Sequence, residues 1–219
     1  TLDRSSAASD VYKRQIPFFI GGILGFIAGL LLVLTGPRGI LENRLVFFVL
    51  DKVTSIFRAI PFIILLALIN PFTRIIVGTG IGPTAALVPL SLAVFPFFAR
   101  QVQVVLSELD RGVIEAAQAS GATFWDIVGV YLREGLPDLI RVTTVTLISL
   151  VGETAMAGAI GAGGLGNVAL TYGYQRFNHD VTILATILIL LLIFFIQFVG
   201  DFLTRKISHR SVSYTHLTL

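Results

Sequence analysis

The stretch Val181–Phe202, VTILATILILLLIFFIQFVGDF, decides the fold class. Its central part, Ile187–Ile196, contains no polar side chain. A helix of about 20 mostly apolar residues crosses the hydrocarbon core of a bilayer, and this stretch is long enough to do so. The whole chain is 55% hydrophobic and only 13% charged, whereas a soluble domain has roughly 25% charged residues. The sequence therefore predicts an integral membrane protein.

Four further stretches have the length and composition of spanning helices. They are Ile16–Leu34, Val53–Asn70, Thr84–Leu106 and Val142–Ala159, of which the second is interrupted by Arg58 and Pro61. We therefore expect an all-α membrane protein with about five spans, forming one transmembrane domain over residues 16–210. The polar segments 1–15 and 211–219 share no pattern with this apolar body, and we interpret them as non-native or disordered tails.

The distribution of Lys and Arg predicts the orientation of the spans, because cytoplasmic loops carry an excess of these residues. With five spans, the 1–2 loop, the 3–4 loop and the C-terminus lie on one side. That side holds eleven basic residues against two, Arg74 and Arg176, on the other, which makes it cytoplasmic. The eleven are Arg38, Arg44, Lys52, Arg58, Arg100, Arg111, Arg133, Arg141, Arg205, Lys206 and Arg210.

The longest polar connection, residues 107–141, is then cytoplasmic and contains signals for two short helices. Asp110 can cap the first helix, and Gly121 can end it in the left-handed conformation. Thr123 with Asp126 resembles a capping box at the start of the second. An apolar stripe follows at helical spacing, which requires that this helix pack either on its own bundle or on a partner. The stripe consists of Phe124, Ile127, Val128, Tyr131 and Leu132.

Two glycine patterns have structural explanations. Gly21, Gly25 and Gly29 recur every four residues in the first span, which lets another helix backbone approach closely. The segment 161–166 matches the dinucleotide fingerprint G-x-G-x-x-G. No strand is predicted before it and it lies on the outer side, so we interpret it as a closely packed turn rather than a nucleotide site.

Several kinds of chemistry lack support in the sequence. There is no G-x-x-x-x-G-K-[ST] motif for ATP, no Cys, and no metal-ligand spacing among the three His. No nucleophile is paired with a base, and a net charge of +3 is too small and scattered to indicate nucleic-acid binding. We expect no catalytic residue, no metal and no cofactor, so an intramembrane enzyme has little support.

The cytoplasmic connection resembles the EAA loop of ABC-importer permeases. The resemblance begins with Glu115, Ala116 and Ala117, followed by Gly121. The wider chain, from about Ile16 to Arg210, resembles methionine-importer permeases at several segments. These are 57–66, 71–79, 155–159, 163–166 and 172–174. In that family the EAA loop docks on a cytoplasmic ATPase, so the resemblance implies that Glu115, Ala116, Ala117 and Gly121 couple the permease to ATP hydrolysis.

The resemblance also implies an assembly in the bacterial inner membrane. Its parts are two copies of this chain, two ATPase subunits that bind the ATP, and an extracytoplasmic substrate-binding protein. Together they import an amino acid, with methionine favoured, by alternating access. A homodimer would surround a central path with ten helices, whereas five are few for a gated pathway.

Two positions depart from the family pattern. Glu134 stands where the EAA loop usually has Pro, and Glu153 stands in the fourth span where an uncharged residue is expected. Ser149, Glu153 and Met156 share one side of that helix and form a candidate translocation-pathway lining. Because an ionisable group at the centre of a span is costly in lipid, we expect Glu153 to face the pathway or the dimer interface, or to bond a neighbouring helix.

The sequence leaves alternatives open for both the substrate and the function. The chain can be a permease for another amino acid or a small peptide. It can also be a passive channel or scaffold whose cytoplasmic loop only caps its own bundle.

Overall fold

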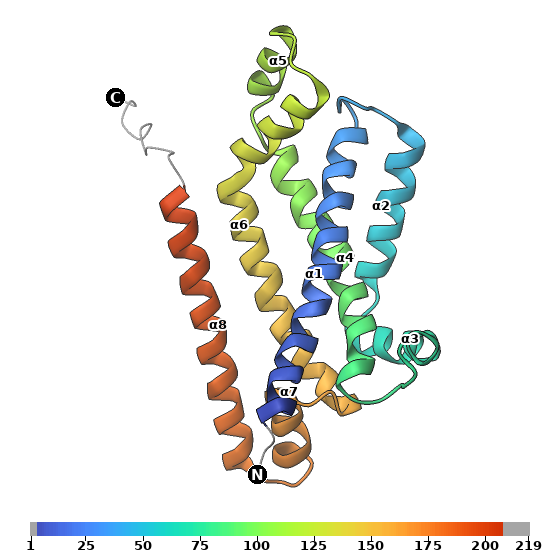
Figure 1. Ribbon diagram of the computed structural model, residues 1–219, viewed down its shortest axis with the longest axis vertical. Coiled ribbons are helices and arrows are strands. Elements are labelled where there is room, and N and C mark those ends of the chain that lie inside the picture. The colour runs from blue at the N-terminus through green and yellow to red at the C-terminus, as the bar shows by residue number, and fades with distance from the viewer. Residues whose placement is uncertain (1–3, 208–219) are drawn as a thin grey trace, which may run out of the picture.

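The computed structural model describes residues 4–207, and every regular element in that range is helical (Figure 1). This agrees with the predicted all-α class. Helix α1 begins at Arg4, inside the segment interpreted as a tail, whereas residues 211–219 lie outside the described range. The elements are α1 (Arg4–Thr35), α2 (Arg44–Ala59), α3 (Phe62–Val77), α4 (Pro83–Ser107), α5 (Arg111–Ala119), α6 (Phe124–Ala157), η1 (Gly158–Ile160), α7 (Gly164–Asn167), η2 (Val168–Tyr174) and α8 (His179–Ile207).

Helices α1 and α4 form the tightest pair of the bundle because glycines on α1 let their backbones touch. A Cβ added at Gly21, Gly25 or Gly29 would meet a backbone carbonyl oxygen of α4 at 2.5, 2.7 and 2.6 Å, respectively. The three carbonyls belong to Ser91, Phe95 and Ala99, so the contact repeats every four residues on both helices. The predicted role of these glycines in helix packing is confirmed.

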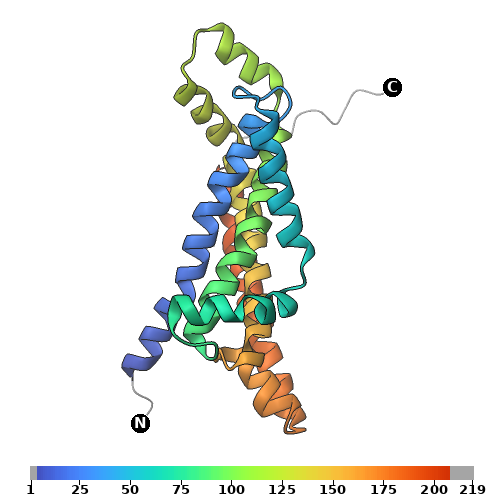
Figure 2. The same cartoon turned by 90° about the vertical axis from the view of Figure 1, so that its right-hand side faces the viewer.

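The second predicted span, Val53–Asn70, is wrong as a single helix. Helix α2 already begins at Arg44 and ends at Ala59, and α3 leaves it at an angle of 109° (Figure 2). The break follows from Pro61, which disfavours helical geometry at the residue before it. Ile60 accordingly has an extended ψ of 119°, and Pro61 serves as the N-cap of α3.

The second cytoplasmic helix and the fourth span are one continuous helix, α6, and not two as predicted. Pro137 lies inside it. A proline removes one hydrogen bond from a helix interior and often kinks it, but the packing of α6 against α4 and α8 maintains the helix through this point.

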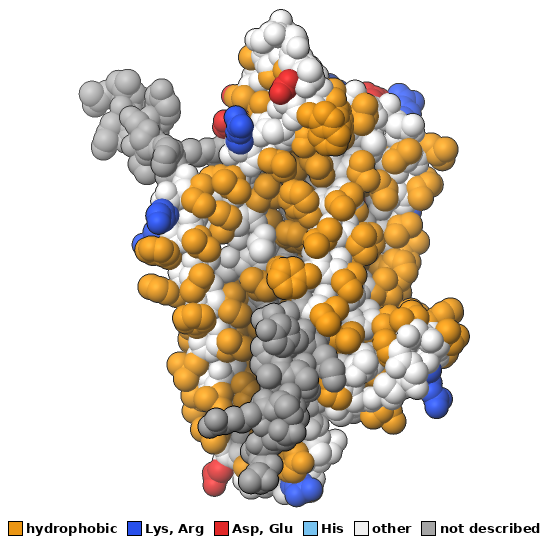
Figure 3. Space-filling model, in the orientation of Figure 1, with side chains coloured by type: hydrophobic (Ala, Val, Ile, Leu, Met, Phe, Trp, Pro, Cys, Tyr) orange, Lys and Arg blue, Asp and Glu red, His pale blue; other side chains and the backbone are white. Residues whose placement is uncertain are grey.

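Four of the described helices are long and apolar enough to cross a membrane, namely α1, α4, α6 and α8, and the bent pair α2–α3 makes a fifth if it counts as one span. Apolar side chains cover much of the outer surface, including that of α8 (Figure 3). The α1–α2 turn, α5 and the end of α8 lie at one end of the molecule, as the alternation of five spans predicts (Figure 1).

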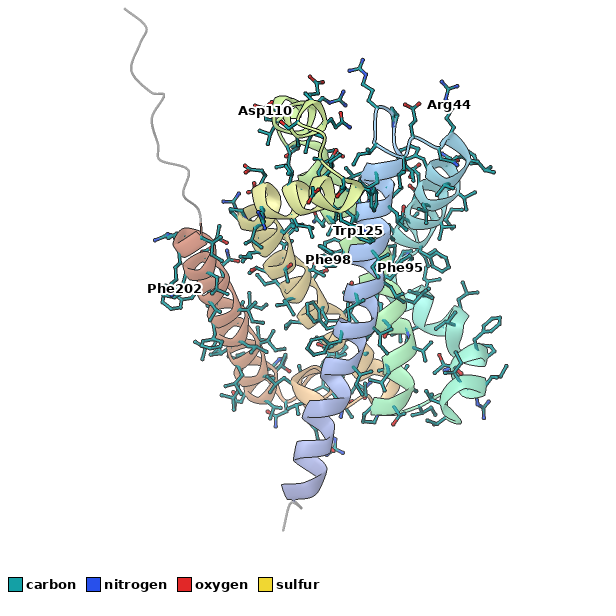
Figure 4. All side chains as sticks on the ribbon, turned by 45° about the horizontal axis from the view of Figure 1, so that its top comes forward. Arg44, Phe95, Phe98, Asp110, Trp125 and Phe202 are labelled. Atoms are coloured by element: carbon teal, nitrogen blue, oxygen red, sulfur yellow. The ribbon has the colours of Figure 1, made fainter. Side chains whose placement is uncertain are left out.

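Arg58 does not lie with the other basic residues of that end. It occupies the last turn of α2, 14 positions after Arg44, which corresponds to roughly 21 Å along the helix axis. Figure 4 shows Arg44 at the same end as Asp110, so Arg58 lies toward the opposite end. Its assignment to the cytoplasmic loop was wrong because the predicted span begins at Val53, whereas helix α2 already begins at Arg44. Arg210 lies outside the described residues.

One ion pair links α2 to α4 inside the bundle. The Arg100 guanidinium donates to Asp51 at 2.7 Å and to the hydroxyl of Ser55 at 2.9 Å, with both charged side chains about three-quarters buried. This link holds the middle of α2 against the last third of α4.

The G-x-G-x-x-G segment forms the tight connection after α6. Gly161, Gly163 and Gly164 have φ values of 70°, 77° and 78°, and Gly166 lies directly against the backbone of Ala155. Its interpretation as a closely packed turn is confirmed, since these glycines meet steric and backbone requirements that larger residues would not.

Candidate functional site

Local hydrogen bonds define both ends of the polar connection between α4 and α6. The carboxylate of Asp110 accepts from the backbone N–H of Gly112 at 2.8 Å and caps α5. At the start of α6, the Thr123 N–H donates to Asp126 at 2.9 Å, and the Asp126 N–H donates back to the Thr123 hydroxyl at 3.4 Å. The Thr123 hydroxyl also donates to the Asp126 carboxylate at 2.6 Å, and this bond, together with the one from the Thr123 N–H, holds the pKa of Asp126 below its usual value. Both predicted caps are confirmed.

Gly121 ends α5 in a Schellman motif. The N–H of Ala122 donates to the Ala117 carbonyl at 3.1 Å, and the N–H of Gly121 donates to the Gln118 carbonyl at 3.0 Å. Gly121 has a φ of 78°, and a Cβ added to it would meet nothing within 4 Å. The turn therefore needs glycine for its backbone conformation and not for space, as predicted.

The apolar stripe of the second helix packs on the chain's own bundle. Ile127, Val128 and Tyr131 are buried together with Ile114 of α5. Their partners come from α1, α4 and the middle of α6, namely Leu34, Phe98, Val102, Leu106 and Leu139. Of the two alternatives for this stripe, the structure selects the first, so any partner must bind to other side chains of the α5–α6 connection.

Those other side chains lie on the outside. Glu115 and Ala116 are exposed, Ala117 is half-buried, and Gly121 is exposed at the turn. Trp125, in the first turn of α6, is 76% exposed, and Val113 of α5 is also exposed. An exposed tryptophan next to small residues is typical of a protein interface, because it provides a large apolar contact area.

The second candidate site is the predicted pathway lining on the outer half of α6, Ser149, Glu153 and Met156, and the structure brings these residues only partly together. Glu153 lines a hollow of about 340 Å³ between α6, α4 and the α2–α3 break, and its Oε2 is buried without a hydrogen-bond partner in the described chain. Ser149 is half-buried one turn earlier, outside this lining, and Met156 is 50% exposed, also outside it. Of the three predicted pathway residues, only Glu153 lines the hollow.

Comparison with known proteins gives the family. The model of the family described as "Binding-protein-dependent transport system inner membrane component" matches residues 21–209. This chain belongs to that family.

Curated relatives of this permease match it over nearly their full length. The probable D-methionine transport system permease protein MetI of Pasteurella multocida (strain Pm70) is 47% identical, with 94% of this chain and 95% of that protein covered. The methionine import system permease protein MetP of Bacillus subtilis (strain 168) is 49% identical over 82% of each.

A solved structure has the same fold. It is a chain of the MetNI methionine ABC transporter in an inward-facing conformation. The TM-score is 0.87 and the identity 44%, covering 91% of this permease and 93% of that chain.

Family membership confirms several predictions together. The chain is a multi-pass inner-membrane component of a transport system, and it is a permease rather than an enzyme. The prediction that residues 115–117 and 121 couple to an ATPase stays a prediction, as does the pathway role of Ser149, Glu153 and Met156.

Sequence reasoning missed Arg58 as a site residue of the permease. It lines the same hollow as Glu153. The available signal was an arginine in a predicted span three residues before a proline, where a helix break is expected.

Proposed function

We propose that this permease is the membrane-spanning subunit of an ATP-driven importer that carries methionine into the cell. The observation that supports this most strongly is the 47–49% identity, over most of the chain, to permeases named for D-methionine or methionine transport. At such identity the fold and the arrangement of the spans are shared, and the substrate of the relatives is the first substrate to test.

In this proposal the α5–α6 connection transmits the motion of a separate ATPase. The capped α5, the Schellman turn at Gly121 and the buried stripe of α6 make the connection one rigid unit with the ends of α1 and α4. Glu115, Ala116 and the exposed Trp125 contact the ATPase, while Ala117 and Gly121 maintain the turn. The rigid continuation of α6 from this unit to Glu153 carries the motion toward the outer half of the bundle.

The remaining partners are a second copy of the permease and an extracytoplasmic binding protein. Helix α3 offers one surface on which a second copy could pack, because it crosses the bundle end with large apolar side chains exposed (Figure 2). These include Ile63, Ile64, Leu68, Phe72, Ile75 and Ile76. Ser149, Glu153 and Met156 then lie on a helix near the path between the copies.

Uptake of radiolabelled methionine into proteoliposomes tests the proposal. The permease is reconstituted with its ATPase and its binding protein, and uptake should require ATP, the binding protein and an ATPase with an intact P-loop. The permease alone should show only background ATP hydrolysis, because its sequence has no P-loop. Hydrolysis by the purified permease alone, or ATP-independent flux, would contradict the proposed mechanism, and uptake of other amino acids only would contradict the substrate.

A further inference from the structure

The hollow at the α2–α3 break combines two opposite charges with apolar walls. Arg58 comes from the last turn of α2 and Glu153 from α6. The apolar part of the lining includes Phe57, Pro61, Leu65 and Phe97. A volume of about 340 Å³ lies at the lower end of the range of small-ligand pockets, which is sufficient for one amino acid but small for a peptide.

The two charges line the hollow without pairing to each other. In the described part of the chain, ion pairs within 4.0 Å join Arg100 to Asp51 and Arg141 to Asp138 only. Oε2 of Glu153 is buried and accepts no hydrogen bond from any described residue. A buried carboxylate oxygen without a partner costs free energy, so a hydrogen-bond donor that reaches Glu153 from the hollow would stabilise this site.

The helix break adds positive potential on the Arg58 side. The first helical hydrogen bonds of α3 are donated by Ile64 and Leu65 to the Pro61 carbonyl, at 2.9 and 3.0 Å. The N–H groups of Phe62 and Ile63 precede them, and no side chain among the described residues caps this terminus. The start of a broken helix in a membrane thus favours an anionic group, as does the neighbouring guanidinium.

We propose that this hollow binds the transported amino acid within the permease, an inference that rests on the proposed import function. Arg58 and the start of α3 bind the α-carboxylate, Glu153 binds the α-ammonium group, and the apolar walls contact the side chain. The matched pair of charges favours a zwitterion, because a simple cation or anion leaves one protein charge unpaired. An apolar side chain is favoured in turn by Phe57, Leu65 and Phe97.

Binding to the permease–ATPase complex without the binding protein tests this site directly. The probes are radiolabelled methionine and two competitors, the amine that lacks the carboxylate and the acid that lacks the amino group. Wild type should bind methionine roughly tenfold or more tightly than either competitor. Glu153→Gln should lower the affinity for methionine by a similar factor but leave the affinity for the acid almost unchanged. Arg58→Gln should lower the affinity for methionine equally but leave the affinity for the amine almost unchanged.

Matched controls separate this pattern from general damage. Asp201→Asn on α8 and Arg74→Gln in the last turn of α3 remove charges outside the hollow and should leave all three affinities unchanged. Glu153→Asp and Arg58→Lys retain the charges and should retain part of the affinity. Gel filtration of each complex and its ATP hydrolysis report correct assembly.

The failure of the site and the failure of the import function have different signatures. Methionine uptake by the complete importer together with unchanged competitor patterns in Glu153→Gln and Arg58→Gln would overturn the site and leave import intact. The same conclusion follows if the wild-type complex transports methionine but shows no binding in the absence of the binding protein. No methionine uptake by the complete wild-type importer would overturn the proposed function and the site with it.

Discussion

The contact between α1 and α4 can be tested with a single methyl group. In Gly25→Ala, the new Cβ would lie 2.7 Å from the carbonyl oxygen of Phe95, whereas ordinary contact begins at 3.4 Å. The atom facing it belongs to a backbone, so no side chain can rotate away. The helices must separate by about 0.7 Å, the difference between these two distances, and the neighbouring contacts at Gly21 and Gly29 loosen with it.

Gly22→Ala is a control on the same helix. A Cβ at Gly22 meets nothing within 4 Å. Both variants gain about the same helix propensity, up to roughly 1 kcal/mol, when glycine becomes alanine. The difference between them therefore isolates the steric cost at Gly25, for which overpacking in a closely packed interior gives about 1–3 kcal/mol.

We expect Gly25→Ala to have a free energy of unfolding lower than that of Gly22→Ala by this amount. The measurement is an equilibrium titration with sodium dodecyl sulfate in mixed micelles, followed by far-ultraviolet circular dichroism. Gly22→Ala should be as stable as wild type or more so. Superimposable titrations of the two variants would show that the backbones of α1 and α4 do not touch at Gly25.

Three further predictions follow from the described contacts. Gly121→Val should lower ATP-driven uptake at least tenfold while membrane insertion stays normal, because a left-handed conformation costs a β-branched residue about 1–2 kcal/mol. Gly121→Asn, which tolerates this conformation better, should keep most of the uptake activity. Asp51→Asn should lower the free energy of unfolding by about 1–3 kcal/mol in the detergent titration by weakening the bonds to Arg100, and an unchanged midpoint would contradict this. A Cys replacing Thr123 should react with an impermeant thiol reagent only from the cytoplasm and one replacing Gly173 only from outside, and the opposite result would reverse the orientation.

Much of the candidate coupling site could be predicted from the sequence because its interactions are local. The caps at Asp110 and Thr123 and the turn at Gly121 depend on hydrogen bonds between residues at most five positions apart. Their residue types and spacing therefore carry nearly all the information. The small-residue contact of α1 was equally visible, since a four-residue glycine repeat has few other uses in a spanning helix.

The hollow around Glu153 could not be predicted in the same way, because its lining comes from segments up to 96 positions apart, from Phe57 to Glu153. The sequence suggested an interruption at Pro61 but not the 109° angle of the bend, which depends on how α2 and α3 pack on α4. Because α2 already begins at Arg44, its last turn carries Arg58 away from the expected loop to this bend, where Arg58 lines the same hollow as Glu153.

The sequence by itself determined that this chain lies in a membrane, that its elements are helical, and where the connection between α4 and α6 turns. These properties follow from hydrophobicity and from hydrogen bonds within a few residues. Only the tertiary structure decided that α6 continues through Pro137, that Ile127 and Tyr131 pack on the chain's own bundle, and that Arg58 and Glu153 line one hollow. Those outcomes depend on competition between distant contacts, and a local pattern does not contain their relative free energies.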